Sequence, residues 1–154
     1  MRSGAYEPDG MTCLCNALRR ASRAVSRHYD EELRGHGLRT TQFSLLWQLK
    51  RGEVRQRDLG GITSHDETTL TRTLRPLIDA GWVSIRAGQD RREKWVRLTG
   101  SGMRKLEEAR PAWERAQGSL RSRLSKTAWS ALFDLLPELT RLVDTADTPK
   151  DKRA

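Results

Sequence analysis

The chain has 154 residues, of which 36% are hydrophobic and 32% are charged, and its formal net charge is +9. This length suits one domain with a real core, no apolar run approaches the roughly 18 residues of a membrane span, and the polar first ten residues are not a signal peptide. We therefore expect a soluble, cytoplasmic protein with no membrane partner. The charge favours DNA or RNA as partner, although a basic surface without a partner would give the same excess.

Apolar residues at helical spacing predict a first helix over residues 12–35. A second helix is predicted over residues 40–51, with Thr40 or Thr41 as its N-cap and Gly52 at its end. Both helices are amphipathic, so each is expected to bury one side in a core.

A short third helix is predicted over residues 55–60, and the pair Gly60-Gly61 is interpreted as a turn. Ser64 and Glu67 have the spacing of a capping box, in which each side chain bonds the other's backbone. A fourth helix is therefore expected to start there and to run to about residue 80.

The apolar pattern then changes from a helical period to strict alternation over residues 82–86 and 94–98, with a polar turn between them. Two long helices, over residues 101–123 and 126–145, complete the chain. The predicted fold is mainly α with a small β-hairpin wing, in the order α-α-α-α-β-β-α-α.

A short helix, a turn, a second helix and a basic hairpin form a winged helix-turn-helix, whose second helix enters the major groove of DNA. At 100° per residue, Leu70, Leu74 and Leu77 of the fourth helix point to the core. Thr68, Arg72 and Arg75 lie on the opposite side, and Thr69 and Thr71 flank them. These five residues are expected to contact DNA. An ordinary amphipathic helix with a solvated polar side is the alternative.

The tip of the hairpin carries two adjacent arginines, Arg91 and Arg92. An arginine that projects from such a tip can enter the minor groove, where the potential is most negative. Asp90 could orient the guanidinium group by a charge-assisted hydrogen bond. A solubilising hairpin tip is the alternative interpretation.

These residues resemble the MarR family (multiple-antibiotic-resistance regulators), over nearly the whole chain from about Cys13 to Val143. The resemblance rests on TTLTRTLRPL at 68–77, AGWV at 80–83, DRR at 90–92, VRLT at 96–99 and Gly102. The pair Gly60-Gly61 departs from the family's pattern, which has better helix formers at that place.

The resemblance implies a homodimer that binds a palindromic operator on double-stranded DNA. Residues 12–37 and 101–147 would form a helical dimerisation base, and residues 40–99 a winged helix-turn-helix lobe that binds DNA. It also implies a repressor that is released by a small ligand or by oxidation, although the sequence leaves repression or activation, and the identity of the effector, open.

The last helix supports a dimer independently, because its apolar stripe is too wide to be left in water. The stripe consists of Trp129, Leu132, Phe133, Leu135, Leu136, Leu139, Leu142 and Val143. Packing of this helix on the first helix of the same chain is the alternative.

The only two cysteines are Cys13 and Cys15. Cys15 resembles the reactive cysteine of the organic-hydroperoxide branch of the family, and Tyr29 matches one of the two phenols that orient its sulfur, whereas the second phenol is missing. The two cysteines lie about 200° apart around a helix, which prevents pairing without unwinding. They could also be small core residues, or could bind a metal or haem.

A ligand pocket, placed by analogy with the family, would be lined by His28, Phe43, Trp47 and Arg51. No spacing of His and Cys indicates a structural metal site, no cofactor is expected, and no catalytic motif indicates an enzyme. The remaining alternative is a dimeric interaction protein that does not bind DNA.

Overall fold

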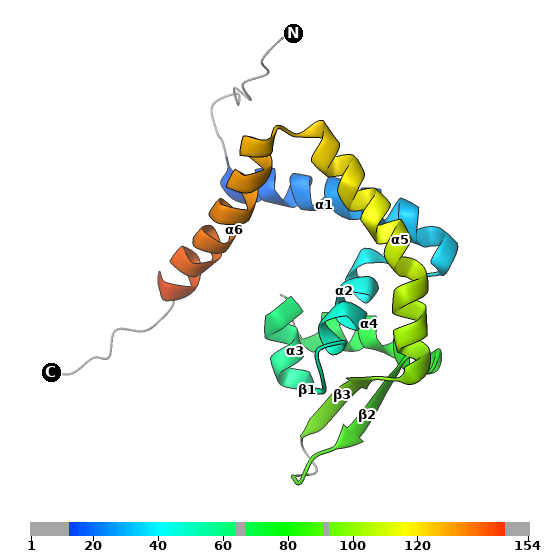
Figure 1. Ribbon diagram of the computed structural model, residues 1–154. Helices are drawn as coiled ribbons and strands as arrows, with labels where there is room; N and C mark the ends of the chain where they lie inside the picture. The colour runs from blue at the N-terminus through cyan, green and yellow to red at the C-terminus, as the bar shows by residue number, and fades with distance from the viewer. Residues whose placement is uncertain (1–12, 64–66, 91–92, 147–154) are drawn as a thin grey trace, which may run out of the picture. The chain divides into compact units, whose positions relative to one another are not determined.

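The computed structural model (Figure 1) describes residues 13–63, 67–90 and 93–146, and the chain divides into two compact units between Ala116 and Gln117. The elements in chain order are α1 (Leu14–Leu33), the 3-10 helix η1 (Arg34–His36), α2 (Thr40–Leu49), β1 (Val54–Arg55), α3 (Gln56–Thr63), α4 (Glu67–Asp79), β2 (Val83–Ala87), β3 (Lys94–Leu98), α5 (Gly100–Arg123) and α6 (Lys126–Ala146). Within the described ranges, no helix has both the length and the apolar character needed to cross a bilayer.

The predicted fold class is confirmed: helices dominate, and the hairpin β2–β3 forms the wing, which extends beyond α2, α3 and α4 (Figure 1). One strand was missed. The sheet has three antiparallel strands in the order β1-β3-β2, because Val54 pairs with Val96 and Arg55 with Trp95. A strand of two residues is too short to show alternation in a sequence.

The start of α2 is held by side chains other than those predicted. Asp30 of α1 accepts a hydrogen bond from the backbone N–H of Thr40 at 2.6 Å, and the Gln42 side chain accepts one from the N–H of Arg39 at 2.9 Å. Arg39 occupies the N-cap position. The predicted Thr40 or Thr41 cap was therefore wrong, because a carboxylate from another helix satisfies the N–H group.

The predicted turn at Gly60-Gly61 was also wrong, since α3 continues through both glycines to Thr63. Leu59 is fully buried and Gly60 is buried as well. Tertiary packing at this point outweighs the low helix propensity of glycine, which costs only about 1 kcal/mol per residue. Ser64, the other half of the predicted capping box, lies outside the described residues.

One hydrophobic core holds the elements of the first unit together. Its fully buried members include Leu33, Leu45, Leu46, Leu59, Leu70, Leu74, Leu77, Val83, Val96 and Leu106. They come from helices α1 to α5 and from two strands of the sheet, so α4 and the wing are carried on the same packed interior.

The root of the wing is attached to α5 by a small polar cluster. The Thr99 hydroxyl donates to the carbonyl oxygen of Gly81 at 2.7 Å and accepts from the N–H of Gly102 at 3.0 Å. A Cβ atom at Gly102 would lie only 2.0 Å from the carbonyl oxygen of Trp82. Only glycine lets α5 approach the backbone at the wing root so closely, which accounts for the glycine in the sequence motif.

Candidate nucleic-acid interface

The two sides of α4 are separated as the spacing predicted. Leu70, Leu74 and Leu77 expose 1%, 1% and 0% of their surface. All of the predicted outward residues are exposed, namely Thr68, Thr69, Thr71, Arg72 and Arg75. The three leucines fix the rotation of the helix about its axis, and so decide which side chains it presents to solvent.

A shallow hollow of about 660 Å³ runs along this outward side, between Glu67 and Asp79. Thr68, Thr71, Arg72 and Arg75 line it, together with Pro76, which the sequence analysis did not include. Within the described part of the chain, neither Arg72 nor Arg75 forms an ion pair, so their donors are available to an external acceptor. Guanidinium and hydroxyl groups of this kind suit base edges and phosphates.

A second hollow, of about 550 Å³, adjoins the first, because Glu67 lines both. It is bounded by β1 and α3, by the start of α4 and by the turn end of the wing, and its basic residues are Arg55, Arg57 and Lys94. The sequence analysis missed these three cations, since they come from separate elements that only the folded chain brings together.

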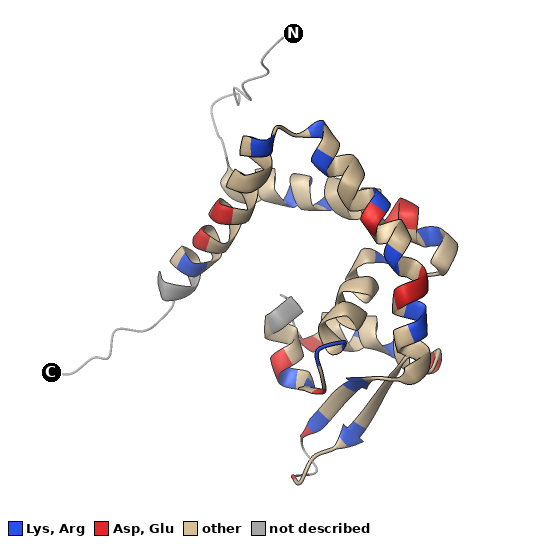
Figure 2. Cartoon of the chain, in the orientation of Figure 1, with Lys and Arg blue, Asp and Glu red and all other residues tan. Residues whose placement is uncertain are grey.

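The predicted wing tip is described only in part. Arg91 and Arg92 lie outside the described residues, and Asp90 is exposed beside them. The N–H of Glu93 donates to the carbonyl oxygen of Asp90 at 2.9 Å, which closes the turn. Figure 2 shows basic residues on both strands of the hairpin, so the wing carries cationic side chains as α4 does.

The predicted ligand residues lie in or beside an aromatic cluster. Phe43 and Trp47 of α2 stack against each other and against Trp113 of α5, with ring centroids 5.9 to 6.1 Å apart. His28 packs edge-on against Tyr29, and its Nε2 lies 3.1 Å from the carbonyl oxygen of Ala116. The fourth predicted residue, Arg51, follows α2 and is exposed.

Trp113 is the member of this cluster that the sequence analysis missed. Its ring also lies 6.4 Å from that of Tyr29, so it connects α1, α2 and α5. Burial raises the pKa of the Tyr29 phenol above its ordinary value. The cluster is continuous with the hydrophobic core, because Phe43 belongs to that core and Trp113 packs against it. Trp47, which is 36% exposed, presents its surface to solvent.

The two cysteines are exposed and free in the single chain, which contradicts their interpretation as core residues of one subunit. Cys13 is the N-cap of α1 and has an extended backbone, with φ −84° and ψ 108°. Because Cys13 precedes the helix, helical spacing does not prevent its pairing with Cys15. Tyr29 lies about 21 Å along α1 from Cys15, so the predicted contact cannot form within one chain.

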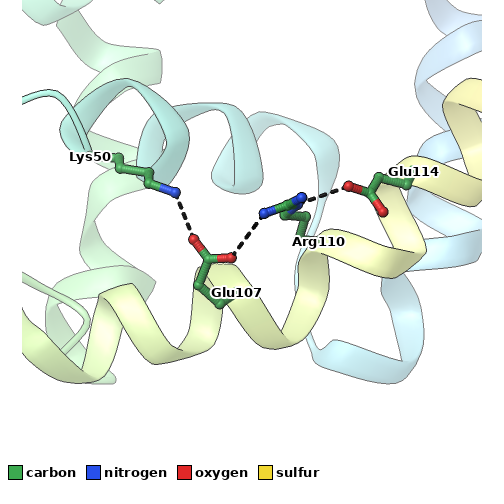
Figure 3. A network of polar contacts seen from close by, with 4 residues as sticks. All are labelled: Lys50, Glu107, Arg110 and Glu114. Carbon is green, nitrogen blue, oxygen red and sulfur yellow. Dashed lines mark hydrogen bonds and ion pairs between the residues drawn. The ribbon is translucent and has the colours of Figure 1, made fainter.

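A row of ion pairs connects α5 to the residue that follows α2 (Figure 3). Glu107 accepts a hydrogen bond from Lys50 at 2.6 Å and lies 3.4 Å from Arg110, which in turn pairs with Glu114 at 2.8 Å. The hydrogen bond from Lys50 lowers the pKa of Glu107 below its ordinary value. This network joins the end of α2 to the middle of α5.

Comparisons with known proteins agree with this arrangement. The model of the MarR family matches residues 36–93. YwoH, an HTH-type transcriptional regulator of Bacillus subtilis (strain 168), is 33% identical over 96 residues, which cover 62% of this chain and 70% of YwoH.

Two solved structures are similar to this chain over most of its length. The M. tuberculosis transcriptional regulator MosR in complex with DNA has a TM-score of 0.80 and 30% identity, over 88% of this chain and 99% of MosR. A mutant of E. coli MarR in complex with operator DNA has a TM-score of 0.73 and 23% identity, over 82% and 92%, and supports the fold alone. Members of the matched family regulate transcription and are not enzymes, as the sequence analysis expected. The chain belongs to the MarR family of transcriptional regulators.

Proposed function

We propose that this regulator is a homodimeric, cytoplasmic repressor that binds a palindromic operator through the outward side of α4. The observation that carries the proposal is the position of Arg72 and Arg75 in the hollow along that side, where neither forms an ion pair with another described residue. The DNA-bound relative MosR supports it, because it shares 30% of its residues with this chain. Footprinting on the DNA upstream of the protein's own gene tests it. A protected pair of symmetric half-sites is expected, and uniform or absent protection would contradict the proposal.

Arg72 lies in the middle of the outward side of α4, and we assign it to a base edge. Arg75 lies nearer the end of α4, and we assign it to a phosphate, because the N-terminal part of a recognition helix enters the groove most deeply. Arg72→Ala should lose about 1–3 kcal/mol of discrimination between bases, whereas Arg75→Ala should weaken all sites alike and reduce the salt slope by about one.

Competition between the operator and duplexes with single base changes separates these two roles. Arg27→Ala is a suitable control, because Arg27 is an exposed arginine of α1 and does not line the hollow along α4. If Arg75→Ala rather than Arg72→Ala changes the rank order of the sites, the assignment is reversed. If neither variant changes binding, α4 does not contact the operator.

We extend the proposed interface to the wing tip, which carries Asp90, Arg91 and Arg92. For the two arginines this proposal rests on the sequence alone. Arg92→Ala should weaken operator and unrelated DNA by similar factors, since a wing arginine responds to groove width and phosphates rather than to base edges. Unchanged affinity at moderate salt in the folded variant would remove the wing from the interface.

The dimer is supported by apolar side chains that remain exposed in the single chain. Leu132, Phe133, Leu135, Leu136 and Leu142 of α6 expose 43%, 59%, 60%, 45% and 62% of their surface. Monomeric proteins rarely leave so large a contiguous apolar patch in water, and a second copy would cover it symmetrically. Sedimentation as a monomer at micromolar concentration would contradict the dimer.

We assign release by a small molecule to the aromatic cluster, in which Trp47 is partly exposed and Arg51 lies close by in the chain. His28 and Phe43 form the inner part of this proposed site. Tryptophan fluorescence in titrations with small aromatic acids tests the assignment, with Trp47→Phe as the conservative variant. Compounds that release the operator without affecting the fluorescence of the cluster would place the effector elsewhere.

A thiol-based signal is the second candidate function, and the exposure of Cys15 in the first turn of α1 favours it. Treatment of the DNA-bound protein with an organic hydroperoxide should release wild type and leave Cys15→Ser bound. Cys13→Ser is the matched control, since it removes a neighbouring exposed thiol. Release of both wild type and Cys15→Ser, or of neither, would exclude Cys15 as the sensor.

A further inference from the structure

On the outer side of the wing sheet, one tryptophan lies between two arginines, with one arginine on each neighbouring strand. Trp95 on β3 pairs across the sheet with Arg86 on β2 and with Arg55 on β1. The guanidinium carbon of Arg86 lies 5.3 Å from the centre of the Trp95 ring, and that of Arg55 lies 5.1 Å from it. Both cations are within cation–π range, so the row Arg55–Trp95–Arg86 connects all three strands.

Each of these arginines also has a carboxylate partner. Glu53 accepts two hydrogen bonds from Arg86, from Nε at 2.7 Å and from Nη2 at 2.6 Å. Glu93 lies 3.5 Å from Nη1 of Arg55. Fork-shaped pairing of this kind is the strongest geometry available to arginine, and Nη1 of Arg86 additionally donates to the carbonyl oxygen of Ala87 at 3.3 Å.

Glu53 remains ionised near neutral pH. The hydrogen bond from Arg86 lowers the pKa of the Glu53 carboxyl group below its ordinary value, against an opposing contribution from desolvation, and the charges of Arg86 and Arg97 lower it further. The negative charge that balances Arg86 is therefore present under the conditions in which the protein would bind DNA.

The wing sheet thus differs from α4, where Arg72 and Arg75 form no ion pair among the described residues. Every unpaired cation that meets a phosphate releases counterions and strengthens binding to any duplex, whatever its sequence. A cation that is already paired inside the protein does not add to this term. The carboxylates therefore remove positive charge from the wing while leaving the α4 arginines available.

We propose that Glu53 is a specificity-determining residue, which pairs with Arg86 so that this arginine stiffens the wing instead of binding phosphate. The inference rests on the proposed DNA-binding function. Glu53 lowers the affinity for unrelated DNA and thereby increases the preference for the operator. Arg86 and Trp95 are positioning residues of the wing, not contacts to DNA.

The salt dependence of DNA binding tests the proposal in the full-length protein. The probes are a duplex of the DNA upstream of the protein's own gene and an unrelated duplex of equal length. Dissociation constants at several potassium chloride concentrations give the slope of log K against log salt, which changes by about 0.9 for each phosphate neutralised. The variants are Glu53→Gln, Arg86→Gln and their combination.

Glu53→Gln should bind the unrelated duplex several-fold more tightly at low salt, with a slope steeper by up to about 0.9, and its preference for the upstream duplex should fall. Arg86→Gln should keep the wild-type slope, and the double variant should return to it. Glu31→Gln on α1 is the matched control, since it removes one exposed carboxylate outside the row. A folding defect cannot mimic the expected result, because a destabilised protein binds more weakly.

Equal behaviour of Glu53→Gln and Glu31→Gln would overturn the proposal, and so would an Arg86→Gln slope that falls by about 0.9, which would identify Arg86 as a phosphate contact. Wild type that does not prefer the upstream duplex would contradict the proposed function, while the slopes on the unrelated duplex would still decide the role of Glu53. Wild type that binds neither duplex would overturn both.

Discussion

The leucines of α4 and those of α6 have the same helical spacing and opposite environments. Leu74 and Leu77 on α4 are 1% and 0% exposed, whereas Leu135 and Leu142 on α6 are 60% and 62% exposed. The core of the first unit covers the leucines of α4, whereas the leucines of α6 in the second unit stay uncovered. An amphipathic pattern therefore predicts that a helix side is buried, but not whether the same chain or another copy covers it.

Truncating one leucine on α4 and one on α6 should give the largest difference in stability effects. Leu74→Ala should lower the free energy of unfolding by about 2–5 kcal/mol at every protein concentration, because it leaves a cavity in a packed interior. The cost of Leu135→Ala should depend on protein concentration, since Leu135 would contribute to stability through association. Urea unfolding at two concentrations tenfold apart measures both, and a concentration-independent loss in Leu135→Ala would contradict the difference.

A methyl group at the root of the wing should have the next largest effect. Gly102→Ala should cost about 1–3 kcal/mol of stability, because the added methyl group meets the Trp82 carbonyl oxygen and forces a backbone shift. Gly118→Ala is the control on the same helix, since nothing lies within 4 Å of the Cβ it would add. Thermal unfolding compares the two variants, and equal or opposite shifts would show that α5 can move away from the wing root at little cost.

A charged residue introduced on α6 should weaken association of two copies without unfolding the chain. Leu135→Glu should weaken dimerisation at least about tenfold, or about 1.4 kcal/mol, while the first unit keeps its fold, because the charge would have to be buried between two copies. Ser130→Glu is the control, as Ser130 is an exposed polar residue of the same helix. Sedimentation velocity distinguishes the two variants, and a stable dimer of Leu135→Glu would place the interface elsewhere.

A weaker, electrostatic effect belongs to the network of Figure 3. The pKa of Glu107 is lowered in the folded chain from the ordinary 4.5, chiefly by the hydrogen bond from Lys50. The stability contributed by this pair is therefore present above pH 4.5 and is lost as the pH falls through the folded pKa. Glu107→Gln and Lys50→Met should both flatten the decrease in unfolding free energy below pH 4.5. Parallel pH profiles for wild type and both variants would show that the pair adds nothing measurable.

The fold class, the order of the long elements and the two sides of α4 could all be predicted from the amino-acid sequence. These features follow from local periodicity, which a chain of 154 residues displays directly. The outward position of Thr68, Arg72 and Arg75 could be predicted because the leucines on the opposite side of α4 admit only one orientation toward a core.

Features that depend on residues far apart in the chain became visible only in the folded protein. The strand β1 exists because Val54 and Arg55 meet β3, the cap of α2 comes from Asp30 on α1, and α3 passes through two glycines because its surroundings are packed. The pairing of Arg86 with Glu53 spans 33 positions of the chain. Composition counts both arginines of the wing row as positive charge, whereas the fold neutralises them, because a charge is balanced by its neighbours in space and not by its neighbours in sequence.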